Sequence, residues 1–192
     1  DPTLIAHWPL DEIEGIAAHD RVTDQVAYAP GELSWEPVGG KSEGALNLDG
    51  EDDCVVAGAI LDPAAGPVSI LVRIKGGSAG QVIISLSNGA NCLMLDADGR
   101  LMTELTSPTR GGSPLFSESV VDDGQWHRVG LIWDGLNRKL CVDDAVVAED
   151  VQDGLVGSGN GLYIGAGKNM QPGSFFSGLI DDVRIYNRAV RP

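Results

Sequence analysis

The stretch SGLIDDVRIYNRAV, residues 177–190, alternates apolar and polar side chains as a β-strand does, and it carries two adjacent carboxylates. Because strand side chains alternate between two faces, Asp181 is predicted to share a face with three aliphatic residues, whereas Asp182 lies on the other face beside Arg184. An ionised carboxylate taken out of water is costly unless a cation or hydrogen-bond donors compensate it. We therefore expect a specific partner for Asp181.

The same period of two runs through most of the chain. Mostly aliphatic residues alternate with other side chains in four further runs, at 68–75, 82–86, 101–105 and 127–133. Turns rich in glycine, asparagine and aspartate separate the runs, and short strands at fairly regular spacing are typical of all-β sandwiches and barrels. No stretch shows a sustained helical periodicity, so helix is predicted to be limited to at most one turn near Leu61–Ala65.

Two local features refine the strand prediction. Pro9 lies inside the first strand candidate, LIAHWPL at residues 4–10. Since a proline cannot donate to a β-ladder, this strand is expected to lie at a sheet edge or to be kinked. The segment Ser107–Ser119 is the longest polar interruption, and we expect it to be a flexible loop.

Length and charge limit the possible functions. The 192 residues, of which 43% are apolar, favour a single domain spanning 1–192 with a full hydrophobic core. The net charge of −15 disfavours nucleic acids and anionic membrane surfaces as partners, because both are negatively charged. Cations, neutral glycans and basic protein surfaces stay possible. No apolar run is long enough to span a bilayer, so membrane insertion is not expected.

The three cysteines, Cys54, Cys92 and Cys141, each lie within an apolar run and lack the spacing of a zinc or redox site. We expect them to be buried as small hydrophobic side chains. One disulfide with one remaining thiol is the alternative, and the sequence leaves it open.

A family pattern extends over nearly the whole chain. Its pieces are AHWPLDE at 6–12, GGKSEGALNLDGEDDCVV at 39–56, DDGQWHRVGLIWDG at 122–135, KLCVDDAVVA at 139–148, GLYIGAG at 161–167 and GLIDDVRIYNRAV at 178–190. In this order they resemble the laminin-G-like, concanavalin A-like jelly rolls that occur as modules of large extracellular bacterial proteins. The resemblance implies two antiparallel sheets packed as a β-sandwich, with the first and last strands close together. It also implies a module of a larger protein that is extracellular, on the cell surface or periplasmic.

Members of this family commonly hold a calcium ion near those two strands, and the resemblance places its carboxylate ligands at Asp20, Asp24 and Asp181. Calcium takes six to eight oxygen ligands, which carboxylates and carbonyls supply together. The loop DRVTDQVAYA, residues 20–29, departs from the family pattern because it has no glycine, which would let carbonyls wrap an ion. A distorted site or no site is the alternative, with Asp181 paired to Arg21 or to backbone N–H groups.

The sequence lacks the catalytic patterns of enzymes with this fold. A retaining glycosidase needs two carboxyl groups about 5 Å apart. The nearest imitation, Glu12 and Glu14 in DEIE, is interpreted as a solvated surface. His127 is interpreted as a hydrogen-bonded core histidine, and neither a G-x-S-x-G elbow nor a phosphate loop occurs. The chain is therefore predicted not to be an enzyme.

Aromatic residues are the sugar-binding candidates, since glycan sites offer a flat ring to the apolar face of a sugar. Tyr163, Phe175 and Phe176 are predicted as ligand-binding residues, because one of two adjacent phenylalanines faces outward in a regular strand. The four tryptophans are predicted to be buried, in strand motifs or under a loop: Trp8, Trp35, Trp126 and Trp133.

These features together predict a non-catalytic recognition or adhesion module that is stabilised by calcium and binds a carbohydrate or glycoconjugate. A domain that binds an extracellular protein and a structural spacer are alternatives within a larger surface protein. A polysaccharide-active enzyme, either a glycosidase or a lyase, is a third alternative. The identity of the ligand and the oligomeric state do not follow from the sequence.

Overall fold

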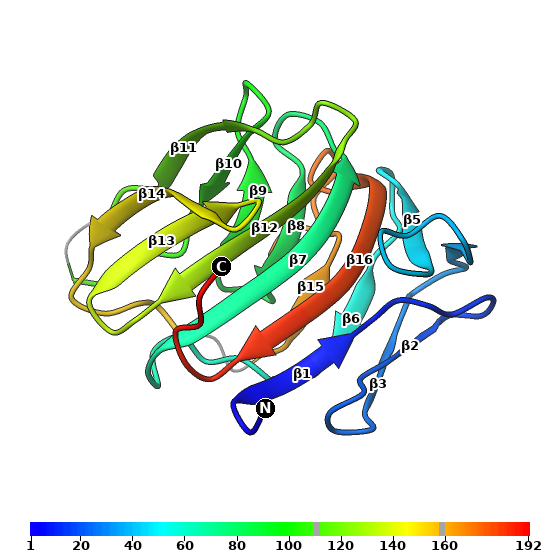
Figure 1. The fold of residues 1–192 in the computed structure, drawn as a ribbon, viewed down its shortest axis with the longest axis horizontal. Helices are drawn as coiled ribbons and strands as arrows, with labels where there is room; N and C mark the ends of the chain where they lie inside the picture. Colours follow the sequence, from blue (N-terminus) through cyan, green and yellow to red (C-terminus); the bar gives the residue numbers. More distant parts are fainter. Residues whose placement is uncertain (110–111, 158–159) are drawn as a thin grey trace.

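Two antiparallel sheets pack face to face in the computed structural model, which describes residues 1–109, 112–157 and 160–192 (Figure 1). These residues contain no helix, which confirms the all-β sandwich predicted from the sequence. The segment predicted to form at most one helical turn is a turn in which the Ala65 N–H donates to the Asp62 carbonyl at 3.0 Å and the Ala64 N–H donates to the Asp62 carboxylate at 3.1 Å. No helix that could cross a bilayer is present in these ranges.

The first sheet has eight strands, in the order β14–β13–β12–β7–β16–β5–β4, and β1 also pairs with β16. The bounds of these strands are β1 Leu4–Trp8, β4 Ser34–Glu36, β5 Ala45–Asp49, β7 Val68–Gly76, β12 Trp126–Trp133, β13 Asn137–Val142, β14 Ala145–Val151 and β16 Ser177–Tyr186. The pairing of β1 with β16 confirms that the first and last strands lie side by side.

The second sheet also has eight strands, in the order β11–β10–β9–β8–β15–β6–β3–β2. The bounds of these strands are β2 Ala17–His19, β3 Val26–Tyr28, β6 Val55–Ala57, β8 Val82–Leu86, β9 Asn91–Leu95, β10 Arg100–Thr103, β11 Leu115–Val120 and β15 Leu162–Ile164. Neighbouring strands are antiparallel, as expected for a sandwich in which one face of each sheet meets the core.

The hydrophobic core lies between the two sheets, where inward-facing side chains of alternating positions meet. Ile70, Val129 and Ile180 of the first sheet are fully buried there. Ile84 and Leu93 of the second sheet lie in the same cluster. Burial of each such side chain stabilises the fold by about 1.5–3 kcal/mol relative to an exposed one.

The tryptophan prediction is confirmed for three of four residues. Trp8, Trp35 and Trp133 are buried. Trp126, at the start of β12, is only half-buried.

The three cysteines are buried and free, as predicted, and the alternative of a disulfide is not realised. Burial raises the pKa of Cys92 to about 12. Because the thiolate is the reactive form of cysteine, a thiol held neutral in this way acts as a small hydrophobic side chain.

Two predictions about local structure have different outcomes. Strand β1 ends at Trp8, directly before Pro9, and among the described strands it pairs with β16 alone, so it lies at an edge as predicted. The prediction of a flexible loop over Ser107–Ser119 is wrong for its second half, because β11 begins at Leu115 and pairs with β10. Polar side chains are tolerated there because β11 is the outermost strand of its sheet. Positions 110 and 111 lie outside the described residues.

A β-bulge in β16 sets the position of the two adjacent carboxylates. Between its pairs with Arg73 and Leu71 of β7, strand β16 has one residue more than β7. Asp182 has a φ of 54° at the bulge, in the left-handed region that aspartate tolerates better than most residues. Asp181 pairs with Arg73 on the outer face, and the extra residue turns the following Val183 and Ile185 toward the core. The prediction that Asp181 shares a face with the aliphatic residues that follow it is therefore wrong.

Candidate ligand-binding site

Asp20, a predicted calcium ligand, organises the loop that follows β2. Its carboxylate is buried and accepts the His7 N–H at 2.8 Å, the Val22 N–H at 2.9 Å and the Thr23 hydroxyl at 2.5 Å. These bonds tie the loop to β1. They use both carboxylate oxygens, so Asp20 acts as an acceptor for protein donors.

Asp181 is compensated by backbone N–H groups. The residue is 2% exposed, and its Oδ2 accepts the N–H groups of Lys41 at 2.8 Å and Ser42 at 3.3 Å. Burial raises the pKa of Asp181, although the two N–H bonds act in the opposite direction. Arg21, the other partner considered, donates instead to Asp11 at 3.1 Å.

Asp182 lies at the centre of a cluster of basic side chains. Its carboxylate contacts His7 Nε2 at 2.9 Å, Arg184 Nε at 2.8 Å and Arg73 Nε at 3.4 Å. Burial alone would raise the pKa of Asp182, but the His7 hydrogen bond and the charges of Arg184 and His7 lower it to about 2. Asp182 therefore links β1, β7 and the bulge of β16.

The residues predicted to bind calcium do not fit the ion in this arrangement. The donors around Asp20 and Asp181 are N–H and hydroxyl groups, whereas calcium needs six to eight oxygen ligands. Asp24 is exposed, with a φ of 57°, and does not join the two buried carboxylates in a cluster of possible ligands. Calcium binding by Asp20, Asp24 and Asp181 stays a prediction, and it would require these donors to be displaced.

One group of three acidic residues does gather elsewhere in the described part of the chain. Ligand atoms of Asp49, Asp52 and Asp53 lie within 4.8 Å of one another on the surface. The Asp49 carboxylate accepts the N–H groups of Glu51 and Asp52, as in an ordinary turn. Partial burial and the charge of Asp49 raise the pKa of Asp53. Nothing else in this turn points to a ligand.

The residues closest to a catalytic pattern make structural hydrogen bonds. Glu12 accepts the N–H of His19 at 2.9 Å, and Glu14 is exposed. His127 lies between Asp143 and Asp123, with ring nitrogens 2.7 and 3.1 Å from their carboxylates. The predicted hydrogen bonding of His127 is confirmed, but the residue is half-buried at the start of β12 with exposed partners, so the prediction of a core position is wrong.

The prediction that Phe175 or Phe176 faces solvent is wrong. Phe176 is 0% exposed in the main core, and Phe175 is 7% exposed in a small cluster with Cys54 and Ala166. Both rings precede β16 in an irregular segment, so strand alternation does not apply to them. Neither ring offers a flat face to a sugar.

Tyr163 keeps a partly exposed ring on the outer face of the second sheet. Its hydroxyl lies 2.8 Å from the Ser87 hydroxyl. Val56 pairs with Tyr163 on one side and with Tyr28 on the other, so the two tyrosines flank it in one row. Tyr28 is 55% exposed. The sequence indicates an outward-facing Tyr28 only because neighbouring residues of a strand face opposite sides and Ala27 is buried.

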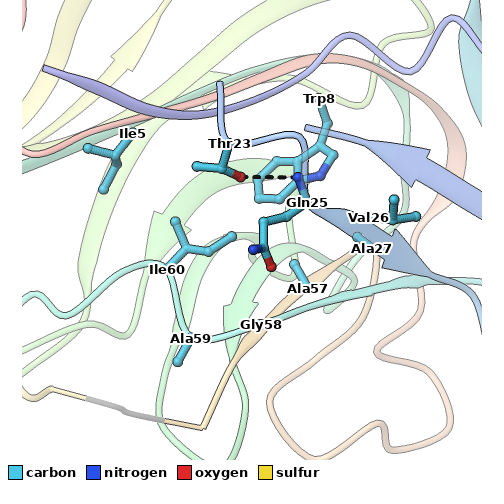
Figure 2. Close-up of a pocket in the computed structure, with 10 residues that line it drawn as sticks. All are labelled: Ile5, Trp8, Thr23, Gln25, Val26, Ala27, Ala57, Gly58, Ala59 and Ile60. Carbon is cyan, nitrogen blue, oxygen red and sulfur yellow. Dashed lines mark hydrogen bonds between the residues drawn. The ribbon is translucent and has the colours of Figure 1, made fainter. Parts of the chain in front are cut away.

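A pocket of about 460 Å³ opens where β1 of the first sheet meets β3 and the end of β6 in the second (Figure 2). We call it the Trp8 pocket. Thr23 and Gln25 bring polar side chains to it, Trp8 also lines it, and Gly58 and Ala59 contribute a short stretch of backbone. Its remaining walls are aliphatic: Ile5, Val26, Ala27, Ala57 and Ile60.

Trp8 belongs to the core and also lines this pocket. The residue is 1% exposed, and its Nε1 is buried with no hydrogen-bond partner. Thr23 contributes a hydroxyl that also donates to Asp20, and its Oγ1 accepts the N–H of Gln25 at 3.3 Å. The sequence predicts the burial of Trp8 but not the pocket, which forms between strands distant along the chain.

The two antiparallel sheets form a jelly-roll β-sandwich of the concanavalin A-like type. The chain belongs to the concanavalin A-like lectin/glucanases superfamily, since the Laminin_G_3 family model matches residues 49–192. No match was found among the curated proteins.

Solved structures with the same fold come from proteins of different kinds. The binding domain of Paraclostridial Mosquitocidal Protein 1 has a TM-score of 0.78 at 10% identity, covering 99% of this chain and 50% of that one. Domain 4 of AbnA, an extracellular arabinanase from Geobacillus stearothermophilus in complex with arabinotriose, has a TM-score of 0.69 at 17% identity, covering 99% and 95%. A Trypanosoma rangeli sialidase has a TM-score of 0.68 at 12% identity, covering 100% and 31%.

These similarities concern the fold, because every identity is low. The chain spans half of the mosquitocidal protein chain and about a third of the sialidase chain, but nearly all of arabinanase domain 4. The fold therefore occurs as one part of larger proteins, among them a mosquitocidal protein, an arabinanase and a sialidase.

Proposed function

We propose that this chain is a non-catalytic module that binds an uncharged carbohydrate, within a larger protein that is extracellular, surface-attached or periplasmic. The Trp8 pocket carries the proposal, because ligand sites are concave, mostly apolar and equipped with a few polar groups. No charged side chain lines its wall. The net charge of −15 also favours a neutral ligand over an anionic one.

Two structural relatives support a binding role. Arabinanase domain 4 was solved with a sugar, arabinotriose, and the mosquitocidal protein segment is named a binding domain. Domain 4 is also nearly the same length as this chain. A module of this size beside a separate catalytic domain is the arrangement that we infer.

The absence of catalysis is part of the proposal. Retaining glycosidases place two carboxyl groups about 5 Å apart around the bond that they cleave. Glu12 Oε1 accepts the N–H of His19 and lies 3.1 Å from its ring nitrogen, and His127 is held by two carboxylates. Groups engaged in this way serve the fold rather than proton transfer to a substrate.

The row of Tyr28, Val56 and Tyr163 is a second surface that a longer glycan could contact. An exposed tyrosine ring offers an apolar face and a hydroxyl, which suits a sugar. Substitution Tyr28→Ala tests this row separately from the Trp8 pocket, because Tyr28 is not part of the pocket wall.

The test is binding of the purified domain to an array of neutral and acidic glycans, run in calcium and in chelator, with reducing-sugar release measured in parallel. We expect retention by neutral glycans, in either buffer, without release of sugar. Silence in both buffers would favour a spacer or a protein-binding domain. Release of sugar, or of an unsaturated product, would favour an enzyme.

A further inference from the structure

Trp8 lines the Trp8 pocket, and its indole carries a buried donor that has no acceptor among the described residues. Its Nε1 is buried and has no hydrogen-bond partner in the described part of the chain. The Nε1 of Trp35, by contrast, donates to the Gly15 carbonyl at 2.8 Å. Buried donors almost always find an acceptor in folded proteins. Because an indole can only donate, a ligand that pairs with it must offer an acceptor oxygen.

The walls around this donor favour a small apolar group on the ligand. Val26, Ala57 and Ile60 are among the aliphatic side chains that form them (Figure 2). Gln25 adds a side-chain amide, which offers one acceptor oxygen and two donor hydrogens. A ligand group that matches the pocket is therefore uncharged and combines a methyl group, an acceptor oxygen and an N–H.

We propose that the Trp8 pocket binds the acetamido group of an N-acetylated sugar, an inference that rests on the carbohydrate-binding function proposed above. The acetamido carbonyl accepts the Trp8 Nε1–H, and its N–H donates to the Gln25 side-chain oxygen. The acetamido methyl contacts the aliphatic wall. A sugar carboxylate is disfavoured, because no cation lines the pocket and Asp20 lies directly behind Thr23.

Binding requires a side chain of the wall to rotate, since the Trp8 N–H is covered by neighbouring atoms. Gln25 is exposed, so it can move without opening the core between the sheets, whereas Ile60 is half-buried and packs against that core. The ring of Trp8 itself keeps its place in that core.

The experiment follows the indole N–H resonances of the four tryptophans in the ¹⁵N-labelled domain during titration with N-acetylglucosamine and N-acetylgalactosamine. Glucose and galactose serve as comparison sugars without the acetamido group. We expect a saturable shift of the Trp8 resonance with an N-acetylated sugar and none with its comparison sugar. The Trp35 resonance, which is already hydrogen-bonded, is the internal control and stays in place.

Two variants test the position of the ligand. A Cβ at Gly58 meets no atom within 4 Å, so Gly58→Leu is expected to fold while its side chain fills the pocket mouth and abolishes binding. Gly31→Leu, equally unhindered but outside the pocket, is the matched control and binds normally. In Trp8→Phe the indole N–H signal of Trp8 is missing, which identifies its resonance in the wild type. The variant is also expected to bind about tenfold more weakly, which corresponds to the loss of one hydrogen bond of about 1.4 kcal/mol.

The outcomes separate this inference from the proposed function. A Trp8 resonance that stays in place, or that moves equally with glucose, would overturn the acetamido assignment. Normal binding by Gly58→Leu would also overturn it. If the domain still binds glycans on the array in these cases, carbohydrate recognition stands and only its location and chemistry fail. If no glycan binds at all, the proposed function fails as well.

Discussion

Substitution Asp182→Asn removes the negative charge that links β1, β7 and β16. The carboxylate of Asp182 contacts His7, Arg184 and Arg73 at 2.9, 2.8 and 3.4 Å. Asparagine has the same shape and also tolerates the positive φ of this bulge, so the backbone is retained. The substitution therefore changes the charge and leaves the fold of β16 in place.

The magnitude follows from the pKa of Asp182, which is lowered from 3.8 to about 2. Since one pKa unit corresponds to about 1.4 kcal/mol, the ionised carboxylate contributes about 2 kcal/mol to the free energy of unfolding at pH 7. The folded pKa lies below the unfolded value. The contribution is therefore fully present above the unfolded value, and it is lost as the pH falls through about 2.

The assay is urea unfolding of the wild type and Asp182→Asn at several pH values. We expect the variant to be about 2 kcal/mol less stable at pH 7, and the difference to shrink below about pH 4. Asp98→Asn is the control, because Asp98 is exposed and forms a long ion pair of 3.7 Å with Arg100. Its effect on the free energy of unfolding should be below about 0.5 kcal/mol. Equal stability at pH 7, or a difference that persists undiminished at pH 2, would refute the reasoning.

Three further predictions concern calcium, a histidine and a buried arginine. Adding excess chelator leaves the melting temperature unchanged, because N–H donors already compensate the buried carboxylates predicted to bind calcium; a fall in melting temperature reversed by calcium would contradict this. Burial lowers the pKa of His127, but Asp143 and Asp123 outweigh it and raise the pKa above 6.5. The stability that His127 contributes is therefore present below about pH 6.5 and is lost as the pH rises through the folded pKa. In His127→Gln, the free energy of unfolding measured in urea should depend less on pH over this range. An unchanged pH dependence would contradict this prediction. Arg138→Met leaves Asp150 without its buried guanidinium partner and lowers the free energy of unfolding by about 3 kcal/mol, measured by urea unfolding; a neutral effect would show that the ion pair adds no net stability.

The fold could be predicted because it depends on features that are local in the sequence. Alternating runs such as 68–75 and 127–133 correspond to β7 and β12. The polar strand β11 was missed, since its side chains at the sheet edge carry little apolar signal. The bulge at Asp182 was missed because period-two reasoning assumes a regular strand.

The candidate site was predicted less well, because its parts come from distant segments. The sequence indicates that Asp181 needs a partner, but not that Lys41 and Ser42 supply it from the loop before β5. It predicts a buried Trp8, but not that the Nε1 lacks an acceptor. Hydrogen-bond satisfaction depends on tertiary packing, which residue type alone does not specify.

The central claim is tested most directly by isothermal titration calorimetry with the neutral glycan that binds the domain best on the array. The chain length of the glycan is measured after the titration. The account predicts saturable binding by the wild type, strong loss of binding in Gly58→Leu, and recovery of the glycan intact. Absence of binding to every neutral glycan, or recovery of shortened chains, would contradict a non-catalytic carbohydrate-binding module.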